Sequence, residues 1–363
     1  HLWYSKKRSA IIMEKILIAF VAAILLSCFR AEEVTNTTTT TPSAPLNSSI
    51  PDLSQNSSTP APPPEVPLKV VCYYNKLSQN RSDATRFNIS DLPKSLCTHV
   101  VYSYATLDSS SLTIQNESLG SDLNSVLALS KVGVQVMLSL GGKGDSLESE
   151  KFSRLVKNGK ARTEFVREAV RFLRKHGFQG LDINWEYPVC WNGYCSKHEK
   201  STDRTNFVNL LGELHKGFRY YNLSLSAAVS PLQSIADHAY DVAGISSNVD
   251  WVNLMTFDYN NGSFEATAIH SPFKGSHSTV DTVNYWIRKG ARSKKLVVGI
   301  PTFGRTFTLA REDGNVPDKP ATKGTATGLN EPGIAAYFEV CTDPENYQRE
   351  KDIGSYIFKG NQW

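Results

Sequence analysis

One strand-like run, FQGLDINWEYP at residues 178–188, constrains the fold of this chain more than any other feature of its sequence. Side chains alternate in direction along a β-strand, so Gly180, Asp182, Asn184 and Glu186 share one face, and apolar residues share the other. Three polar side chains on one interior face need partners, which an ordinary buried strand does not offer. This pattern is typical of a (β/α)8 barrel, whose inward residues near the strand ends line the active site.

Strand-like and amphipathic segments alternate after residue 67, as a parallel α/β architecture requires. Amphipathic helices are expected at residues 163–177 and 206–218. The strands that we predict cover residues 70–74, 98–105, 134–142, 180–186, 223–229, 251–259 and 295–303. An eighth strand is needed to close a barrel, and none is visible in residues 306–363. Because an open barrel leaves two strand edges unpaired, we expect the chain to be a C-terminally truncated fragment, with its barrel over residues 68–305.

The first 67 residues have the composition of a leader and a linker. Residues 1–12 are interpreted as a translated leader or a fusion scar, and residues 13–31 as a secretory signal peptide starting at Met13. Its apolar run is too short to span a membrane, and a retained anchor is the alternative. Residues 32–67 are rich in Ser, Thr and Pro without apolar periodicity, which predicts a disordered, O-glycosylated stalk.

The glycosylation sequons and the cysteines indicate the same compartment. N-glycosylation sequons begin at Asn36, Asn47, Asn56, Asn80, Asn88, Asn116, Asn222 and Asn261. We predict disulfides Cys72–Cys97, because the first two strands start side by side, and Cys190–Cys195, because both lie in one short loop. Cys28 lies in the signal peptide and Cys341 is left without a partner. Together these features predict a secreted, extracellular glycoprotein.

Charge and residue spacing exclude some functions. The net charge is +4 on 363 residues without a basic block, so we expect no nucleic-acid partner. The His, Cys and Glu residues show no metal-ligand spacing, so neither a metal nor another cofactor is expected. No membrane association is expected once the signal peptide is cleaved.

The run at 178–188 resembles the DGxDxDxE signature of glycoside hydrolase family 18, the chitinases and chitinase-like lectins, and the resemblance extends over residues 69–363. It implies a TIM barrel with a small α+β insertion between strands seven and eight, of which residues 306–363 would be an incomplete part. It implies chitin or N-acetylglucosamine oligosaccharides as ligands. It also implies a mechanism in which the substrate's own acetamido oxygen is the nucleophile.

The resemblance assigns roles to the inward residues of the run. Glu186 would protonate the glycosidic oxygen, and Asn184 stands where the family has the Asp that orients the acetamido N–H and stabilises the oxazolinium. Asp182, deeper in the barrel, would support residue 184. Because Asn184 is neutral, it does not raise the pKa of Glu186 as a neighbouring carboxylate would. We expect the reaction rate to fall by about 10²–10³ as a result of the missing charge. Gln179 replaces the first Asp, but its parity directs it away from the inner face, so we expect it to affect packing.

A second departure lies in the segment NLMTFDY, which resembles the family pattern M-x-Y-D. Met255 and Asp258 are kept, but Phe257 replaces the Tyr whose hydroxyl would reach the acetamido group, at a cost of roughly 1–3 kcal/mol. Arg305 matches a family position that lines the cleft, with a simple ion pair as the alternative. His99 is expected to be a satisfied barrel histidine.

Sugar-binding aromatics are also fewer than in the family. Leu77, Lys143 and Phe264 stand where chitinases commonly carry a Trp, and the Trp at the end of strand eight would lie beyond Trp363. Trp185 is expected to pack against a helix because of its outward parity. The other candidate stacking surfaces are Tyr73, Tyr187, Tyr259 and Phe303.

Three hypotheses remain open at this point. The first is a secreted chitinase-like lectin that binds chito-oligosaccharides with weakened or lost hydrolysis. The second is a slow but active endo-chitinase with Glu186 as its acid. The third is a scaffold or signalling glycoprotein without a carbohydrate ligand. Whether the chain is an enzyme is left undecided, because fold alone does not determine activity.

Overall fold

The computed structural model describes residues 68–81, 85–93, 95–195, 202–260, 263–311, 316–326, 332–337, 339, 347–350 and 353–363. The predicted leader, signal peptide and stalk lie outside these residues, as do Cys28, Cys341 and the sequons at Asn36, Asn47, Asn56 and Asn261. No helix in the described ranges is long and apolar enough to cross a membrane.

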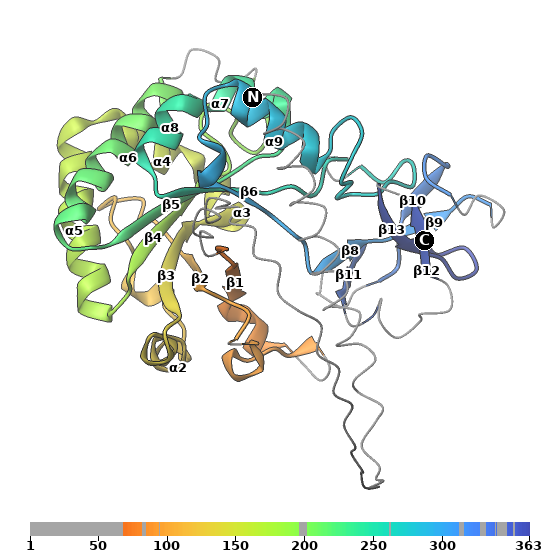
Figure 1. The fold of residues 1–363 in the computed structure, drawn as a ribbon, viewed down its shortest axis with the longest axis horizontal. Coiled ribbons are helices and arrows are strands. Elements are labelled where there is room, and N and C mark those ends of the chain that lie inside the picture. The colour runs from red at the N-terminus through yellow and green to blue at the C-terminus, as the bar shows by residue number, and fades with distance from the viewer. Residues whose placement is uncertain are drawn as a thin grey trace, which may run out of the picture. The chain divides into compact units, whose positions relative to one another are not determined.

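Seven parallel strands form the central sheet, in the order of the chain (Figure 1). Their bounds are β1 Val71–Asn75, β2 His99–Ala105, β3 Gln135–Gly141, β4 Gly180–Asn184, β5 Ser224–Val229, β6 Trp251–Leu254 and β7 Leu296–Val298. Each strand pairs with the next, and β1 and β7 are the two edges of the sheet. The described residues contain no eighth strand in this sheet. This is the parallel α/β arrangement of a (β/α)8 barrel that the sequence predicts, with seven of its strands present.

The helices cover the outer face of the sheet (Figure 1). The α-helices are α2 Leu123–Leu127, α3 Gly142–Asp145, α4 Ser149–Lys157, α5 Gly159–His176, α6 Asp203–Tyr220, α7 Gln233–Ala239, α8 Val242–Asn248 and α9 Thr279–Arg288. The 3-10 helices are η1 Lys76–Asn80, η3 Ile89–Asp91, η4 Asn116–Ser118, η5 Ala128–Val132, η6 Ser146–Glu148 and η8 Ser293–Lys295. The two predicted helices are α5 and α6, and both begin before the predicted residue. In α5 the reason is the side chain of Asn158, which accepts hydrogen bonds from two backbone amides of the first turn.

Three predicted strands extend two residues or more beyond the observed strand end. The strand predicted at 180–186 is β4, which ends at Asn184. The segments 251–259 and 295–303 were predicted as single strands, but β6 ends at Leu254 and β7 ends at Val298. Asp258 has a φ of 57°, in the left-handed region, so the chain has left the sheet before it. Phe303 begins a separate strand, β8 Phe303–Arg305, which pairs with β11 Ile334–Ala336. Both segments therefore turn away from the sheet where the site residues begin.

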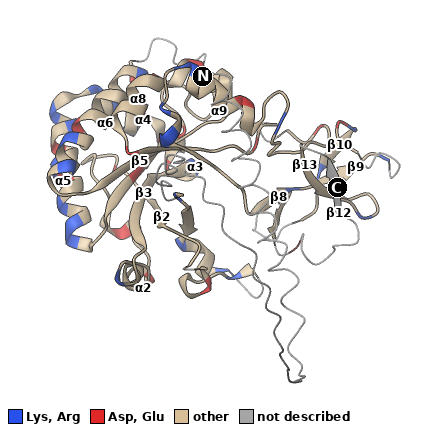
Figure 2. Cartoon of the chain, in the orientation of Figure 1, with Lys and Arg blue, Asp and Glu red and all other residues tan. Residues whose placement is uncertain are grey.

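Two apolar regions lie on opposite faces of the sheet. The large core between sheet and helices contains Trp185, which stacks on Phe152 at 5.6 Å and meets Phe207 edge-on at 6.0 Å. The outward parity predicted for Trp185 is therefore confirmed. Figure 2 shows that charged residues lie mainly on the outer helices, most densely on α5.

Inside the barrel, a small cluster of Val101, Met137 and Trp251 fills the lower layer. His99 packs edge-on against Trp251 at 4.9 Å, and its Nδ1 lies 2.8 Å from the hydroxyl of Thr98. Burial lowers the pKa of His99 to about 4. His99 is thus a neutral, satisfied barrel histidine, as predicted.

After β7 the described residues form three antiparallel pairs of strands. The remaining strands are β9 Phe307–Leu309, β10 Ala321–Lys323, β12 Tyr347–Glu350 and β13 Gly354–Ile357. The pairs are β8 with β11, β9 with β10, and β12 with β13. A separate apolar cluster holds Phe307, Trp363 and Phe264, so Phe264 belongs to the packing of this segment.

Candidate active site

The polar ladder of β4 faces the barrel interior at the carboxyl ends of the strands. Asp182 is 0% exposed and Asn184 is 2% exposed. A glycine is required beside them, because a Cβ on Gly141 would lie 2.2 Å from the backbone oxygen of Asn184, and the φ of Gly141 is 111°. Gly141, the last residue of β3, therefore lets β3 and β4 approach closely at the site. Gln179 precedes the ladder and accepts a hydrogen bond from the backbone of Val136 at the start of β3, which is the structural role expected for it.

Asp182 is the centre of a hydrogen-bond network in the barrel floor. Its carboxylate accepts bonds from Tyr73 Oη at 2.9 Å, Ser139 Oγ at 2.8 Å, Ser226 Oγ at 2.7 Å and Asn253 Nδ2 at 3.2 Å. Burial raises the pKa of Asp182, and these donors oppose the rise. The hydroxyl of Tyr73 also accepts a bond from Asn253 at 2.8 Å. Tyr73 therefore contributes its hydroxyl to the floor, which is a different role from the sugar-stacking surface considered for it.

Asn184 is left with a polar atom unpaired. Its Oδ1 is buried and has no hydrogen-bond partner among the residues that the structure describes. The expected support from Asp182 does not take the form of a direct bond, because the recorded partners of the Asp182 carboxylate are the four donors above. The amide of Asn184 instead acts as a donor toward Tyr104, whose pKa burial and the nearby Glu186 raise well above its usual range. A buried acceptor without a donor costs free energy, so this atom is available to a donor from outside the described residues.

Glu186 follows the last residue of β4 by two positions and is half-buried. Burial raises the pKa of its carboxyl to about 7, with Lys143 lowering it and Asp258 raising it by smaller amounts. The neutral Asn184 contributes nothing to this rise, as expected. Burial is the main cause of the raised pKa, and whether Glu186 is a poorer acid without a carboxylate at position 184 stays a prediction. A carboxyl with this pKa is partly protonated at neutral pH, as a general acid needs to be.

Asp258 is held in a clamp. Arg305 donates to both of its carboxylate oxygens, from Nε at 2.8 Å and from Nη2 at 2.7 Å, and His270 Nδ1 lies 3.3 Å away. Burial acts to raise the pKa of Asp258, but Arg305 and His270 together hold it well below its usual range. Arg305 thus forms the ion pair that was the alternative for it; because its partner Asp258 is a predicted site residue, the cleft-lining role stays a prediction.

The remaining site residues predicted from the sequence lie at the ends of β4 and β6. Phe257 meets Phe303 edge-on, with ring centroids 5.9 Å apart. Met255, two positions before Phe257, is half-buried. Tyr187 is half-buried, and burial and the adjacent Glu186 raise its pKa well above its usual range. Tyr259 is buried and bonds to Thr282 at 2.7 Å, so it is not exposed for stacking.

Two positions where the family commonly has a Trp present no aromatic ring. Leu77 is 59% exposed on η1, and Lys143 is exposed on α3. The positive charge of Lys143 lowers the pKa of Glu186, so a cation lies near the acid. The site therefore offers fewer flat apolar surfaces than a sugar-binding cleft normally uses.

Both predicted disulfides, Cys72–Cys97 and Cys190–Cys195, are confirmed. In the described ranges one group of possible metal ligands comes together, formed by Cys190, Cys195 and His238. Its two sulfurs are joined to each other, so this group does not offer thiolate ligands.

Several residues of the site were missed by sequence reasoning. Tyr104, Ser226 and Asn253 reach the ladder from β2, β5 and β6. Asn253 carried a usable signal, because it shares the inward face of its strand with Trp251 and Met255. The other two lie in apolar or small-residue segments, where parity alone does not distinguish a site residue from packing.

The family model and the relatives that match this chain indicate the same family. The family model described as "Glycosyl hydrolases family 18" matches residues 69–363. Probable chitinase 10 of Drosophila melanogaster is 36% identical over 345 residues, which are 89% of this chain and 15% of that protein. The chain thus spans a small part of this relative's length.

Solved structures agree with the sequence comparison. Catalytic domain 2 of the Group II chitinase of Ostrinia furnacalis aligns with a TM-score of 0.76 and 38% identity, covering 81% of this chain and 82% of that one. Human YKL-39, described as a pseudo-chitinase with retained chitooligosaccharide binding properties, aligns with a TM-score of 0.71 and 30% identity, covering 81% and 84%. With the family model matching most of the chain, this protein belongs to glycosyl hydrolases family 18.

Proposed function

We propose that this chain is a chitinase-like protein that binds chito-oligosaccharides at the carboxyl ends of β1–β6, with weakened or lost hydrolysis. The observation that carries the proposal is the buried, unpartnered Oδ1 of Asn184. An acetamido N–H of an N-acetylglucosamine residue is a donor of the kind that this atom lacks. The pseudo-chitinase YKL-39, which is similar to this chain, is described as retaining chitooligosaccharide binding, and this supports binding without efficient turnover.

Weak hydrolysis follows from two substitutions that act on the same group of the substrate. Asn184 places a neutral amide where a carboxylate would face the positive oxazolinium, and Phe257 provides a ring without a hydroxyl. Removal of one preorganised electrostatic stabiliser typically costs about 10²–10³ in rate. Asp258 is moreover engaged by Arg305 through both oxygens, so it is less available to the substrate.

A second candidate function is slow but genuine chitin hydrolysis. It is favoured by the pKa of Glu186, which burial raises to about 7. In this mechanism Glu186 gives its proton to the glycosidic oxygen while the acetamido oxygen of the substrate attacks the anomeric carbon. Asn184 Oδ1 would accept the acetamido N–H and so orient the acetamido group for attack on the anomeric carbon. It would not neutralise the positive charge that develops on the oxazolinium.

We further propose that the protein is a secreted glycoprotein. The support is the signal-like segment at residues 13–31, the series of sequons and the two disulfides.

Calorimetric titration with chitotriose to chitohexaose tests the binding proposal. We expect measurable binding that Asn184→Leu weakens about tenfold or more, because the substitution removes the acceptor and keeps the volume. Asn248→Leu is the matched control, since Asn248 is a half-buried Asn at the end of α8, outside the site. Turnover of a chromogenic chitobioside should be at least about a hundredfold below that of a family member with Asp and Tyr at these positions.

Three outcomes separate the candidate functions. Turnover at the ordinary rate of the family would refute the weakened site. Low turnover that Glu186→Gln abolishes would establish slow hydrolysis. Absence of both binding and turnover would leave the scaffold interpretation.

A further inference from the structure

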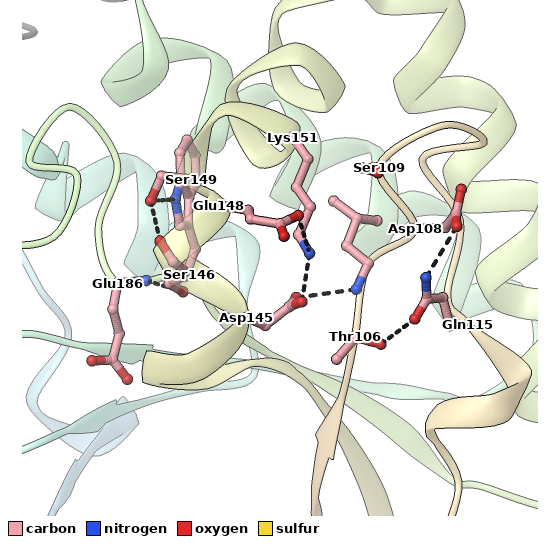
Figure 3. A network of polar contacts seen from close by, with 12 residues as sticks. Thr106, Asp108, Ser109, Gln115, Asp145, Ser146, Glu148, Ser149, Lys151 and Glu186 are labelled. Carbon is pink, nitrogen blue, oxygen red and sulfur yellow. Dashed lines mark hydrogen bonds and ion pairs between the residues drawn. The ribbon is translucent and has the colours of Figure 1, made fainter.

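The backbone of Glu186 lies beyond the hydrogen bonds of the sheet. The pairing of β4 with β3 ends at Asn184, which lies opposite Gly141. The next backbone anchor is a side chain, because the N–H of Glu186 donates to Ser146 Oγ at 2.9 Å (Figure 3). In the figure the carboxyl of Glu186 points away from this bond, so Ser146 holds the main chain and leaves the acid group clear.

Ser146 is held firmly by its own surroundings. It is 1% exposed and begins η6, a 3-10 helix of three residues that directly follows α3, a helix of four residues. Helices this short do not maintain themselves, so their position depends on tertiary contacts. A local bond adds to them, from Ser149 Oγ to the backbone oxygen of Ser146 at 2.7 Å.

A buried ion pair adds a further contact. Lys151 Nζ lies 2.6 Å from Asp145 Oδ1, and the two side chains are only 7% and 4% exposed. The other oxygen of Asp145 accepts a bond from the backbone of Leu107, in the loop after β2, at 3.0 Å. Figure 3 shows Asp145 beside Lys151, and Asp145 precedes Ser146 in the chain. Desolvation offsets the attraction within a buried pair, but removal of one partner leaves an uncompensated buried charge.

We propose that Ser146 is a positioning residue for the acid Glu186, and that the Asp145–Lys151 ion pair fixes Ser146 in the place where it can act. The inference rests on the proposed function in one respect, that Glu186 is the acid of the site. Loss of the Ser146 hydroxyl would free the main chain of residues 185–187, and a displacement of about 1 Å at a reacting group can cost 10²-fold in rate.

The electrostatic surroundings of Glu186 come from several elements. The charged or titratable groups that interact with it are Lys143 on α3, Tyr104 on β2, Asp258 after β6, Tyr187 next to it, and Tyr240 after α7. Ser146 is uncharged, so its removal changes the titration of Glu186 only by letting the carboxyl move among these groups or into water.

The experiment compares Ser146→Ala with a matched variant, Ser246→Ala. Ser246 is also 1% exposed, and its Oγ accepts a backbone N–H bond from Arg292 at 3.0 Å, outside the site. The first readout is the titration of the Glu186 carboxyl, which is monitored by carbon NMR. The signal of Glu186 is assigned as the one that is lost in the variant Glu186→Gln. In Ser146→Ala we expect the pKa to fall from about 7 toward the ordinary value of 4.5, because the released side chain reaches water. In Ser246→Ala it should remain unchanged.

The second readout is kinetic and uses the background Asn184→Asp with Phe257→Tyr. There Ser146→Ala should lower kcat about tenfold or more and leave KM within about twofold. If this background stays inactive, residues 184 and 257 are not what limits hydrolysis, while the NMR titration still decides the role of Ser146. An unchanged Glu186 titration in Ser146→Ala, with a melting temperature matching that of Ser246→Ala, would overturn the inference.

The ion pair is tested separately by Asp145→Asn, which keeps the acceptor for Leu107 and removes the nearer of the two negative charges that face Lys151, the other being Glu148 at 3.5 Å. The variant should shift the Glu186 titration in the same direction as Ser146→Ala. A folded Asp145→Asn protein with the wild-type titration would show that the pair does not act on Glu186.

Discussion

Asn184→Asp tests most directly how charge is used at this site. Residues 184 and 186 are two positions apart, which corresponds to roughly 7 Å along an extended backbone. Two negative charges at this distance repel by about 2 kcal/mol at an effective dielectric constant of about 20. Since a like charge disfavours the ionised form, the pKa of Glu186 should rise from about 7 to roughly 8.5.

The expected kinetic result has two parts. The new carboxylate faces the developing oxazolinium, so kcat/KM on a chromogenic chitotrioside should rise by about 10²-fold or more. The alkaline limb of the pH profile, where Glu186 loses its proton, should move upward by the same roughly 1.5 pH units. Addition of Phe257→Tyr restores a hydroxyl aimed at the same acetamido group. The double variant should therefore gain more than the product of the single gains.

Two controls make this result interpretable. Phe303→Tyr adds the same hydroxyl to the ring that packs edge-on against Phe257, and should not reproduce the gain. Glu186→Gln on the double background should abolish whatever activity was gained. An alkaline limb that stays near pH 7 in Asn184→Asp would refute the electrostatic reasoning. A double variant that binds oligosaccharide and stays inert would show that the missing aromatic surfaces limit the reaction.

The other predictions concern stability. The pKa of Asp258 is lower in the folded protein than in the unfolded chain, so its clamp stabilises the protein above about pH 4, and this stabilisation is lost as the pH falls. Arg305→Gln should therefore lower the melting temperature at pH 7 and have much less effect near pH 2. A difference in melting temperature between wild type and variant that stays the same from pH 7 to pH 2 would show that the pair with Asp258 does not stabilise the protein. The Cys72–Cys97 disulfide closes a loop with a sequence separation of 25, so Cys72→Ala with Cys97→Ala should cost about 3 kcal/mol in urea unfolding. Non-reducing peptide mapping that joins Cys72 to Cys341 would show that the strand register is wrong.

The sequence alone determined the features that depend on local periodicity. The two-residue repeat of a strand predicted that Asp182 and Asn184 face inward and that Trp185 packs outward, and all three do so. The alternation of strands and helices predicted the parallel sheet, because that order of elements has few other stable arrangements. The two disulfides followed from positions that are close along the chain or at the starts of neighbouring strands.

The tertiary structure decided what depends on residues that are distant in sequence. The partners of Asp182 come from β1, β3, β5 and β6, and only the register of the sheet brings them to one carboxylate. The bond from Glu186 to Ser146 joins residues 40 positions apart. The pKa of Glu186 could not be read from its neighbours in the sequence, because burial in the folded barrel sets most of it. The engagement of Asp258 by Arg305 likewise required β6 and β7 to end early, so that the segments after them meet.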